Sequence, residues 1–204
     1  FGGHPWVPPD FAWPKHPIGE YRFLGQIDFE EIVAPHGDAR CHDLPANGLL
    51  SLFYATDEEG EVFWQDDDDM LGFFWPRPES HHLLAPPGGS APDACRLALR
   101  NRLRLPERRE LLGDDASIDE DALETMLRVL PKHLDLSGQW LLGYPLYNTL
   151  AYDPTPGDDW TALLTLPSLD AFEWCWHDGD RLMVFIETSR LAMRDFAHLR
   201  CDAG

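Results

Sequence analysis

The sequence predicts an α+β fold in which duplicated β-rich halves form one core, with a helical insertion between them. Apolar, β-prone runs lie near both ends of the chain, a helical pattern fills the middle, and the early motifs recur late. The 204 residues, 44% of them hydrophobic, can bury one large core. We therefore expect a single domain, 1–204, divided into a half-repeat 1–91, the insertion 92–135 and a half-repeat 136–204.

The first half begins with five prolines in twenty residues, which predict an extended segment because proline fixes φ and lacks a backbone donor. Residues 21–29 and 49–54 are apolar and β-prone, and each predicts a strand. The turn signal Glu59-Gly60 and the apolar residues 61–64 predict a third strand, paired with the second in a hairpin. Residues 86–89, all Pro or Gly, predict a loop.

The middle of the chain changes to helical spacing. Leu97, Leu99 and Leu103 predict one helix, ended by Pro106. A second helix is expected after the capping pair Ser117 and Glu120, and Pro131 ends it. Its apolar stripe has the i, i+3, i+4, i+7 spacing of a buried helix face and consists of Leu123, Met126, Leu127 and Leu130.

The last part returns to β character. Residues 160–166 and 181–186 predict strands, Asp178-Gly179 predicts the turn before the second of them, and 191–198 predict a short final helix. A shift of 140 places Gly3 on Gly143, Pro5 on Pro145 and residues 23–24 on 163–164, and a shift of 132 places 52–53 on 184–185. This recurrence is the basis for the predicted duplication.

The charge balance narrows the classes of partner. Asp and Glu number 36 against 16 Lys and Arg, a formal net charge of −20. Such a surface repels phosphate backbones and anionic headgroups, so we expect neither nucleic acid nor membrane as a partner. Four scattered cysteines make no disulfide framework, which favours a reducing, cytoplasmic location. Cys175, between two tryptophans, is expected to be a buried thiol.

No pattern of residues predicts a catalytic, metal or cofactor site. His81-His82 lacks further ligands at zinc spacing, and Cys175, His177 and Asp178 cannot share one face of a strand. We therefore expect no metal and no cofactor, and the sequence favours a protein that is not an enzyme.

Two charged clusters leave alternatives open. Asp28, Glu30 and Glu31 follow a strand, where carboxylates could do acid–base work, but a solvated strand end is preferred. Six arginines could bind phosphate, although pairing with the chain's own carboxylates is preferred; they are Arg96, Arg100, Arg102, Arg104, Arg108 and Arg109.

Several motifs resemble those of the YwqG-like family, a bacterial domain of unknown function (1963). They are residues 1–8, Trp13-Pro14, residues 23–28 with Gln26-Ile27-Asp28, the stretch 138–145, Trp176-His177-Asp178-Gly179, and residues 191–196. The resemblance covers nearly the whole chain and implies a duplicated α+β core with no established reaction. Residues 166–168 depart from the second Q-I-D that the family would place there. The resemblance also suggests an immunity or antitoxin role.

Two functions from different classes follow. The preferred hypothesis is an acidic protein-binding module, a monomer or weak dimer, that neutralises a basic toxin or effector by covering its surface. Its expected surface is a run of four aspartates with aromatic anchors on either side: Trp64, Asp66, Asp67, Asp68, Asp69, Phe73, Phe74 and Trp75. A solvated loop is the plainer interpretation of the aspartates. The alternative is an enzyme or small-ligand-binding protein with its site in a cleft between the half-repeats.

Overall fold

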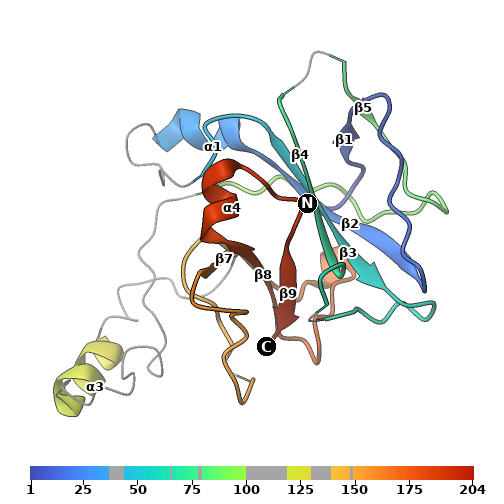
Figure 1. Ribbon diagram of the computed structural model, residues 1–204. Coiled ribbons are helices and arrows are strands. Elements are labelled where there is room, and N and C mark those ends of the chain that lie inside the picture. Colours follow the sequence, from blue (N-terminus) through green and yellow to red (C-terminus); the bar gives the residue numbers. More distant parts are fainter. Residues whose placement is uncertain (37–43, 65, 78–79, 100–118, 130–138, 148) are drawn as a thin grey trace.

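The computed structural model describes residues 1–36, 44–64, 66–77, 80–99, 119–129, 139–147 and 149–204. Its regular structure is mainly β (Figure 1). Within the described residues a three-stranded sheet and a four-stranded sheet form the body, and a two-stranded pair lies beside them. Helices are few and short.

The predicted α+β class is therefore wrong, and the fold is β-rich with about 13% helix. The expected helical insertion contributes one described helix, α3 (Glu120–Val129). Residues 93–99, expected to begin a helix, have no regular structure, and the rest of that predicted helix lies outside the described residues. Leu97 and Leu99 are both exposed, so no packed apolar face holds this segment in a helix.

The three-stranded sheet has the order β2-β3-β4 and is antiparallel throughout. Strands β2 (Glu20–Asp28) and β3 (Leu49–Thr56) lie close to where their apolar runs predict them. The predicted third strand at 61–64 is wrong, because that segment makes only one isolated bridge, between Thr56 and Val62. The true partner of β3 is β4 (Met70–Trp75), which follows the aspartate run.

The four-stranded sheet is built from the C-terminal part of the chain in the order β6-β7-β8-β9. It contains β6 (Trp140–Leu141), β7 (Trp160–Pro167), β8 (Arg181–Glu187) and β9 (Arg200–Ala203). The structure confirms the predicted strands β7 and β8. The predicted helix at 191–198 is α4 (Thr188–Met193), which begins earlier and is followed by β9, a strand not expected from the sequence.

Both sheets carry a bulge at matching positions. In β2 the register skips Leu24, between the pairs Phe23–Phe53 and Gly25–Leu52. In β7 it skips Leu163, between Ala162–Phe185 and Leu164–Val184. Strands β3 and β8 occupy equivalent positions in the two sheets at the predicted shift of 132 residues, whereas the bulges in β2 and β7 correspond at a shift of 139, one less than the predicted 140. This likeness favours duplication, and the half-repeat boundaries stay a prediction.

The main core is shared by the two sheets. One continuous cluster of buried side chains joins Leu50 and Leu52 of β3 to Val184 and Ile186 of β8. Phe196, which follows α4, stacks on Phe29 and packs against Phe74, with ring centroids 6.0 and 5.2 Å apart. The C-terminal part of the chain thus completes the core of the N-terminal sheet.

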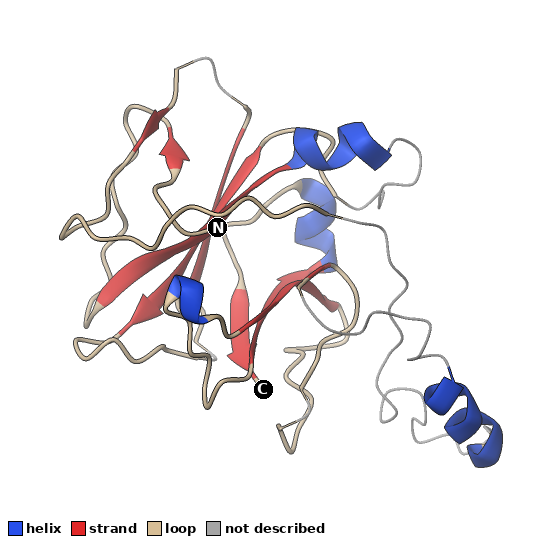
Figure 2. Cartoon of the chain, turned by 180° about the vertical axis from the view of Figure 1, so that it is seen from behind, coloured by secondary structure: helices blue, strands red, loops and turns tan. Residues whose placement is uncertain are grey.

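The outer face of the three-stranded sheet is covered by the proline-rich N-terminal segment, as Figure 2 shows from behind. Phe11 and Trp13 pack on Phe53, with ring centroids 6.0 and 5.2 Å apart. The short strand β1 (Trp6–Val7) pairs with β5 (His82–Leu83). Extended proline-rich chain suits this covering role because it has few backbone donors to satisfy.

The remaining helices lie at strand ends. Helix α1 (Phe29–His36) follows β2 directly, and a 3₁₀ turn, η3 (Asp170–Phe172), follows β7.

Helix α3 is capped by the Asp119 carboxylate, which accepts the Asp121 and Ala122 N–H groups at 3.0 and 3.2 Å. The expected cap Ser117 lies outside the described residues. In the part of the chain that the structure describes, no helix combines the length and apolarity needed to cross a bilayer.

Candidate functional site

A cavity of about 620 Å³ lies where the two sheets meet. One wall is the end of β2 with the first turn of α1, and the facing wall is formed by β6 and β7. Residues 95–99 close a third side. The cavity is therefore a cleft between the N-terminal and C-terminal parts of the chain.

The floor of this cleft is apolar and rigid. Ile27, Leu164 and Leu166 are buried and belong to the shared core. Each sits on a strand paired across its sheet, so the floor cannot collapse without moving a sheet. The third side is different in kind, because Leu97 and Leu99 are exposed and their segment has no regular structure.

The mouth carries charged side chains held in ion pairs. The Asp28 carboxylate lies 3.2 Å from the Arg77 guanidinium, which also donates to Glu30 at 2.6 Å. The Glu30 hydrogen bond and the Asp28 charge raise the pKa of Arg77. Glu31 pairs with Arg96 at 3.0 Å across the opening. Of these charged side chains, Asp28, Glu31 and Arg96 line the cleft, whereas Glu30 and Arg77 lie outside its lining.

Local structure explains why these groups gather. The Asp28 carboxylate accepts the Glu30 N–H at 3.1 Å, which begins α1 directly after β2. That abrupt start places Glu31 and Ile32 beside the strand end. In the cluster Asp28, Glu30 and Glu31 each carboxylate is paired with an arginine; Glu30 and Glu31 are exposed, whereas the Asp28 side chain is only 16% exposed.

Gln26 has a structural role that its motif alone does not reveal. Its amide nitrogen donates to the Trp6 carbonyl at 2.9 Å and to the Ser51 hydroxyl at 2.7 Å, and its oxygen accepts the Trp6 N–H at 3.4 Å. The side chain therefore binds β1 to the central sheet. It lines the cleft, but both of its amide hydrogens are already used within the protein.

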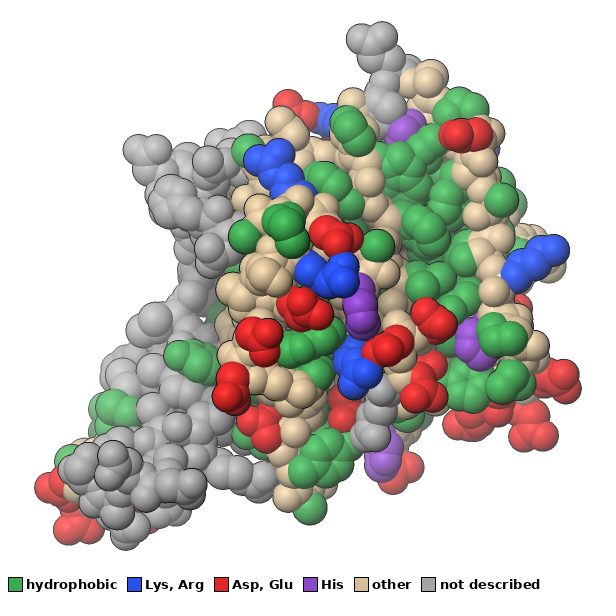
Figure 3. Space-filling model, viewed as in Figure 1, with side chains coloured by type: hydrophobic (Ala, Val, Ile, Leu, Met, Phe, Trp, Pro, Cys, Tyr) green, Lys and Arg blue, Asp and Glu red, His purple; other side chains and the backbone are tan. Residues whose placement is uncertain are grey.

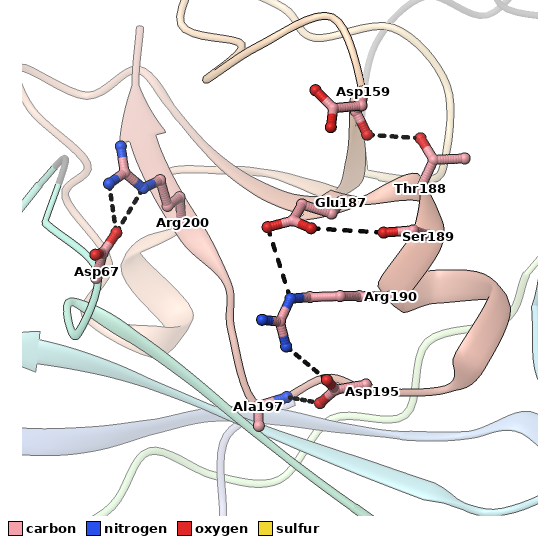
Figure 4. Close-up of polar contacts among 9 residues, drawn as sticks. All are labelled: Asp67, Asp159, Glu187, Thr188, Ser189, Arg190, Asp195, Ala197 and Arg200. Atoms are coloured by element: carbon pink, nitrogen blue, oxygen red, sulfur yellow. Dashed lines mark hydrogen bonds and ion pairs between the residues drawn. The ribbon is translucent and has the colours of Figure 1, made fainter.

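The expected partner-binding surface does not form one continuous patch. Asp66, Asp67 and Asp68 are exposed in the turn before β4, whereas Asp69 is only 4% exposed. Asp67 is engaged by Arg200 of β9, as Figure 4 shows, with its carboxylate 2.8 Å from the arginine Nε. The Asp68 carbonyl accepts a hydrogen bond from the Tyr21 hydroxyl at 2.6 Å.

Asp69 is a structural carboxylate. It accepts the Asp66 N–H at 2.8 Å and so closes the turn. Burial raises its pKa, and the Asp66 and Asp68 charges act in the same direction, against the lowering effect of the hydrogen bond. A buried acceptor of this kind holds the loop in shape and presents little surface to a partner.

The four aromatic anchors point to different places. Phe74 packs in the core against Phe29 and Phe196. Phe73 and Trp75 alternate to the opposite face of β4, where Phe11 contacts both rings at 5.0 and 5.5 Å. Trp64 is half-buried against Trp176, 6.3 Å away, and belongs to the shared core. Each of these four aromatic side chains therefore packs, at least in part, against other residues of the protein, which leaves less of its surface for a partner.

Acidic and basic side chains are mixed on the face over α4 and β9 (Figure 3). Arg190 lies between Glu187 and Asp195, at 3.6 and 2.5 Å (Figure 4). The net charge of −20 is therefore not gathered into one uniform surface here. Surface pairs of this sort add little stability and mainly fix local geometry.

The cysteines and histidines singled out in the sequence are separated. Cys175 is exposed, so its expected burial is wrong; Trp174 and Trp176 on either side are buried instead. His81 packs against Trp6, 5.1 Å away, and its neighbour His82 is exposed. No group of three or more metal-ligating side chains gathers among the described residues. Of the six clustered arginines, Arg96 alone is described, and it pairs with Glu31 as preferred.

Comparison with protein families matches residues 1–203 to a family described as a domain of unknown function (DUF1963). The chain belongs to this family. The resemblance noted in the sequence is thereby confirmed over essentially the whole chain. A comparison with curated proteins found no match.

Motifs of the DUF1963 resemblance meet at the cleft. Gln26-Ile27-Asp28 lines one wall and Gln139-Trp140-Leu141 the other. The sequence analysis placed these motifs in different half-repeats. It singled out Asp28, Glu31 and Arg96, which line the cleft, but did not bring them together in one site. The sequence signal that could have found the cleft is that both stretches carry motifs of the family resemblance.

Proposed function

We propose that the protein binds a small amphipathic molecule in the cleft between its two sheets. The observation that carries the proposal is the cleft's combination of size and lining. A volume of about 620 Å³ is within the usual range of small-molecule sites. A buried aliphatic floor and a charged mouth suit a ligand with one apolar end and one polar end.

Charge at the mouth narrows the class of ligand. The two carboxylates that line the cleft, Asp28 and Glu31, are each paired with an arginine, so a neutral polar end is favoured over a charged one. The proposal is binding and not catalysis, because Asp28 and Glu31 are held in ion pairs with arginines.

A fluorescent probe tests the cleft directly. We expect the neutral, apolar dye N-phenyl-1-naphthylamine to brighten on binding the protein. Ala98→Trp places an indole in the third side of the cleft from an exposed position, so the fold should tolerate it. This variant should lose the signal, while Ala122→Trp, an exposed position on α3, should keep it. Undiminished dye binding by Ala98→Trp would remove the cleft as the site.

A second candidate is the acidic protein-binding module. It is supported by the exposed carboxylates of Asp66 and Asp68 and by the net charge of −20. An immunity protein acting through this turn should lose protection of cells against its cognate basic toxin when both residues become alanine. Asp67 and Asp69 are retained in that variant, since their contacts are structural. Full protection by the double variant would exclude this turn as the binding surface.

A further inference from the structure

The cleft between the sheets runs along an open edge of the N-terminal sheet. Among the described residues, β2 is an outer strand in the order β2-β3-β4. The Phe29 N–H donates to the Gly48 carbonyl at 3.0 Å, so the backbone at Phe29 is directed toward the β3 side. Backbone groups alternate in direction along an antiparallel strand, and those of Gln26 are therefore directed to the open edge. Gln26 is one of the residues that line the cleft.

Pairing on this edge stops just before the cleft. The Gly2 N–H donates to the Leu24 carbonyl at 3.4 Å, which places the N-terminal segment beside the bulge of β2. Two residues further along β2, the side-chain amide of Gln26 is engaged by Trp6 and Ser51. The backbone N–H and C=O of Gln26 have no hydrogen-bonding partner on this edge among the described residues. One main-chain donor and one main-chain acceptor thus remain for a ligand.

A second side of the cleft is also a stretch of main chain. Residues 95–99 leave the N-terminal segment at Cys95, whose N–H donates to the Phe1 carbonyl at 2.9 Å. They line the cleft together with Phe1. The Arg96 guanidinium lies 3.0 Å from the Glu31 carboxylate of α1, which holds this stretch near the end of β2. The cleft is therefore a slot, with β2 along one side, residues 95–99 along another and Phe1 at one end.

The C-terminal sheet shows what an edge of this kind accepts. The matching bulges place β7 on β2, with Thr165 at the position of Gln26. On β7 this edge is covered by β6, and the Leu142 N–H donates to the Leu163 carbonyl at 2.8 Å, as the N-terminal segment does at the bulge of β2. There the pairing continues, because Trp140 lies opposite Thr165. A strand thus covers in one sheet the position that lines the cleft in the other.

We propose that the ligand of the cleft is an extended peptide from another polypeptide chain, which adds to the open edge of β2 as a short strand. This inference rests on the proposed function, because it names the ligand class of the same cleft. Hydrogen bonds to the Gln26 backbone supply affinity, and alternate apolar side chains of the peptide reach the floor of Ile27, Leu164 and Leu166. Peptide amides are polar and neutral, which suits a mouth whose carboxylates are already in ion pairs.

A matched pair of peptides tests the main-chain contacts. The acetylated, amidated tetrapeptide Gln-Trp-Leu-Leu copies residues 139–142, the segment that covers β7. We expect it to bind the protein in calorimetric titration and to displace N-phenyl-1-naphthylamine. The same peptide with N-methyl groups on its tryptophan and leucine amides keeps the side chains but cannot donate from those positions. It should bind about tenfold more weakly or worse.

Variants and hydrogen exchange then locate the peptide. Ala98→Trp, which narrows the slot, should abolish peptide binding, whereas Ala122→Trp on α3 should bind as the parent does. In amide exchange followed by NMR, the peptide should slow exchange of the Gln26 N–H about tenfold or more, because it adds a hydrogen bond there. The dye offers no carbonyl to this N–H and should slow its exchange much less.

The outcomes separate this inference from the proposed function. If the dye binds the cleft but the peptide does not, or if the methylated peptide binds equally well, the cleft stands as a small-molecule site and the peptide assignment is overturned. If neither dye nor peptide binds, both proposals fail. A dimer that forms without peptide, and that the peptide does not dissociate in sedimentation, would assign the edge to a second copy and would also overturn the inference.

Discussion

Replacing Phe196 with alanine tests whether the two sheets fold as one unit. The ring is 1% exposed, it stacks on Phe29 and packs against Phe74, and it belongs to the segment between α4 and β9. Removing a buried phenylalanine ring costs about 3–5 kcal/mol, because burial is lost and a cavity remains. For a domain of this size each kcal/mol lowers the melting temperature by about 2–4 °C, so a fall of roughly 6–20 °C is expected.

Urea denaturation followed by tryptophan fluorescence and by far-ultraviolet circular dichroism measures this cost. The eight tryptophans include Trp75 in β4 and Trp160 in β7, so the fluorescence samples both sheets, and a single cooperative unit gives fluorescence and dichroism curves that coincide and shift together. Met193→Ala, at a position 69% exposed on α4, is the control and should change stability by less than about 0.5 kcal/mol. A loss below about 1 kcal/mol for Phe196→Ala, or two separate transitions, would refute a core shared by both sheets.

Three further changes have defined outcomes. Gly72→Ala should lower the free energy of unfolding in urea by about 1–3 kcal/mol, because a Cβ there meets the Phe196 carbonyl and lies 2.8 Å from Leu199. The control Gly157→Ala should be nearly neutral, because the nearest neighbour of its Cβ is 3.4 Å away. Gln26→Leu removes the hydrogen bonds to Trp6 and Ser51 and should cost about 1–3 kcal/mol, and an equal loss in the exposed control Gln139→Leu would contradict it. Burial raises the folded-state pKa of Asp69, so its contribution is fully present below the ordinary carboxyl range and is lost as pH rises through the raised value. Asp69→Asn should therefore be more stable than the parent near pH 7, with the difference shrinking toward about pH 4; a difference independent of pH would contradict this.

Strands whose apolar runs are long and continuous could be predicted from the sequence. β3, β7 and β8 were found because each buries side chains on both faces and so appears as a nearly unbroken apolar run. β2 is only partly buried, and it was found because its apolar residues are β-prone. β4 was missed because a glycine, Gly72, interrupts it and four aspartates precede it. Its place in the sheet depends on pairing with β3 and on the close approach of Phe196, neither of which is local.

The short strand β9 shows the same limit. Its sequence, Arg200 to Ala203, has no strand signature, and its conformation comes from pairing with β8. The cleft was beyond prediction in detail, since it joins segments from the two ends of the chain. The sequence predicted that a cleft could lie between the half-repeats, but not which residues line it, because the lining depends on how the two sheets pack together.

The dependence of the first sheet on residues 196–199 has a consequence for synthesis. Phe29 and Phe74 leave the ribosome well before Phe196, whose ring packs against both of them. The nascent chain therefore exposes these two apolar rings to solvent until Phe196 has been synthesised. Stable folding must then wait until that late segment has emerged. During this interval the exposed apolar rings are a binding site for chaperones, and a chain that ends before Phe196 should be prone to aggregate.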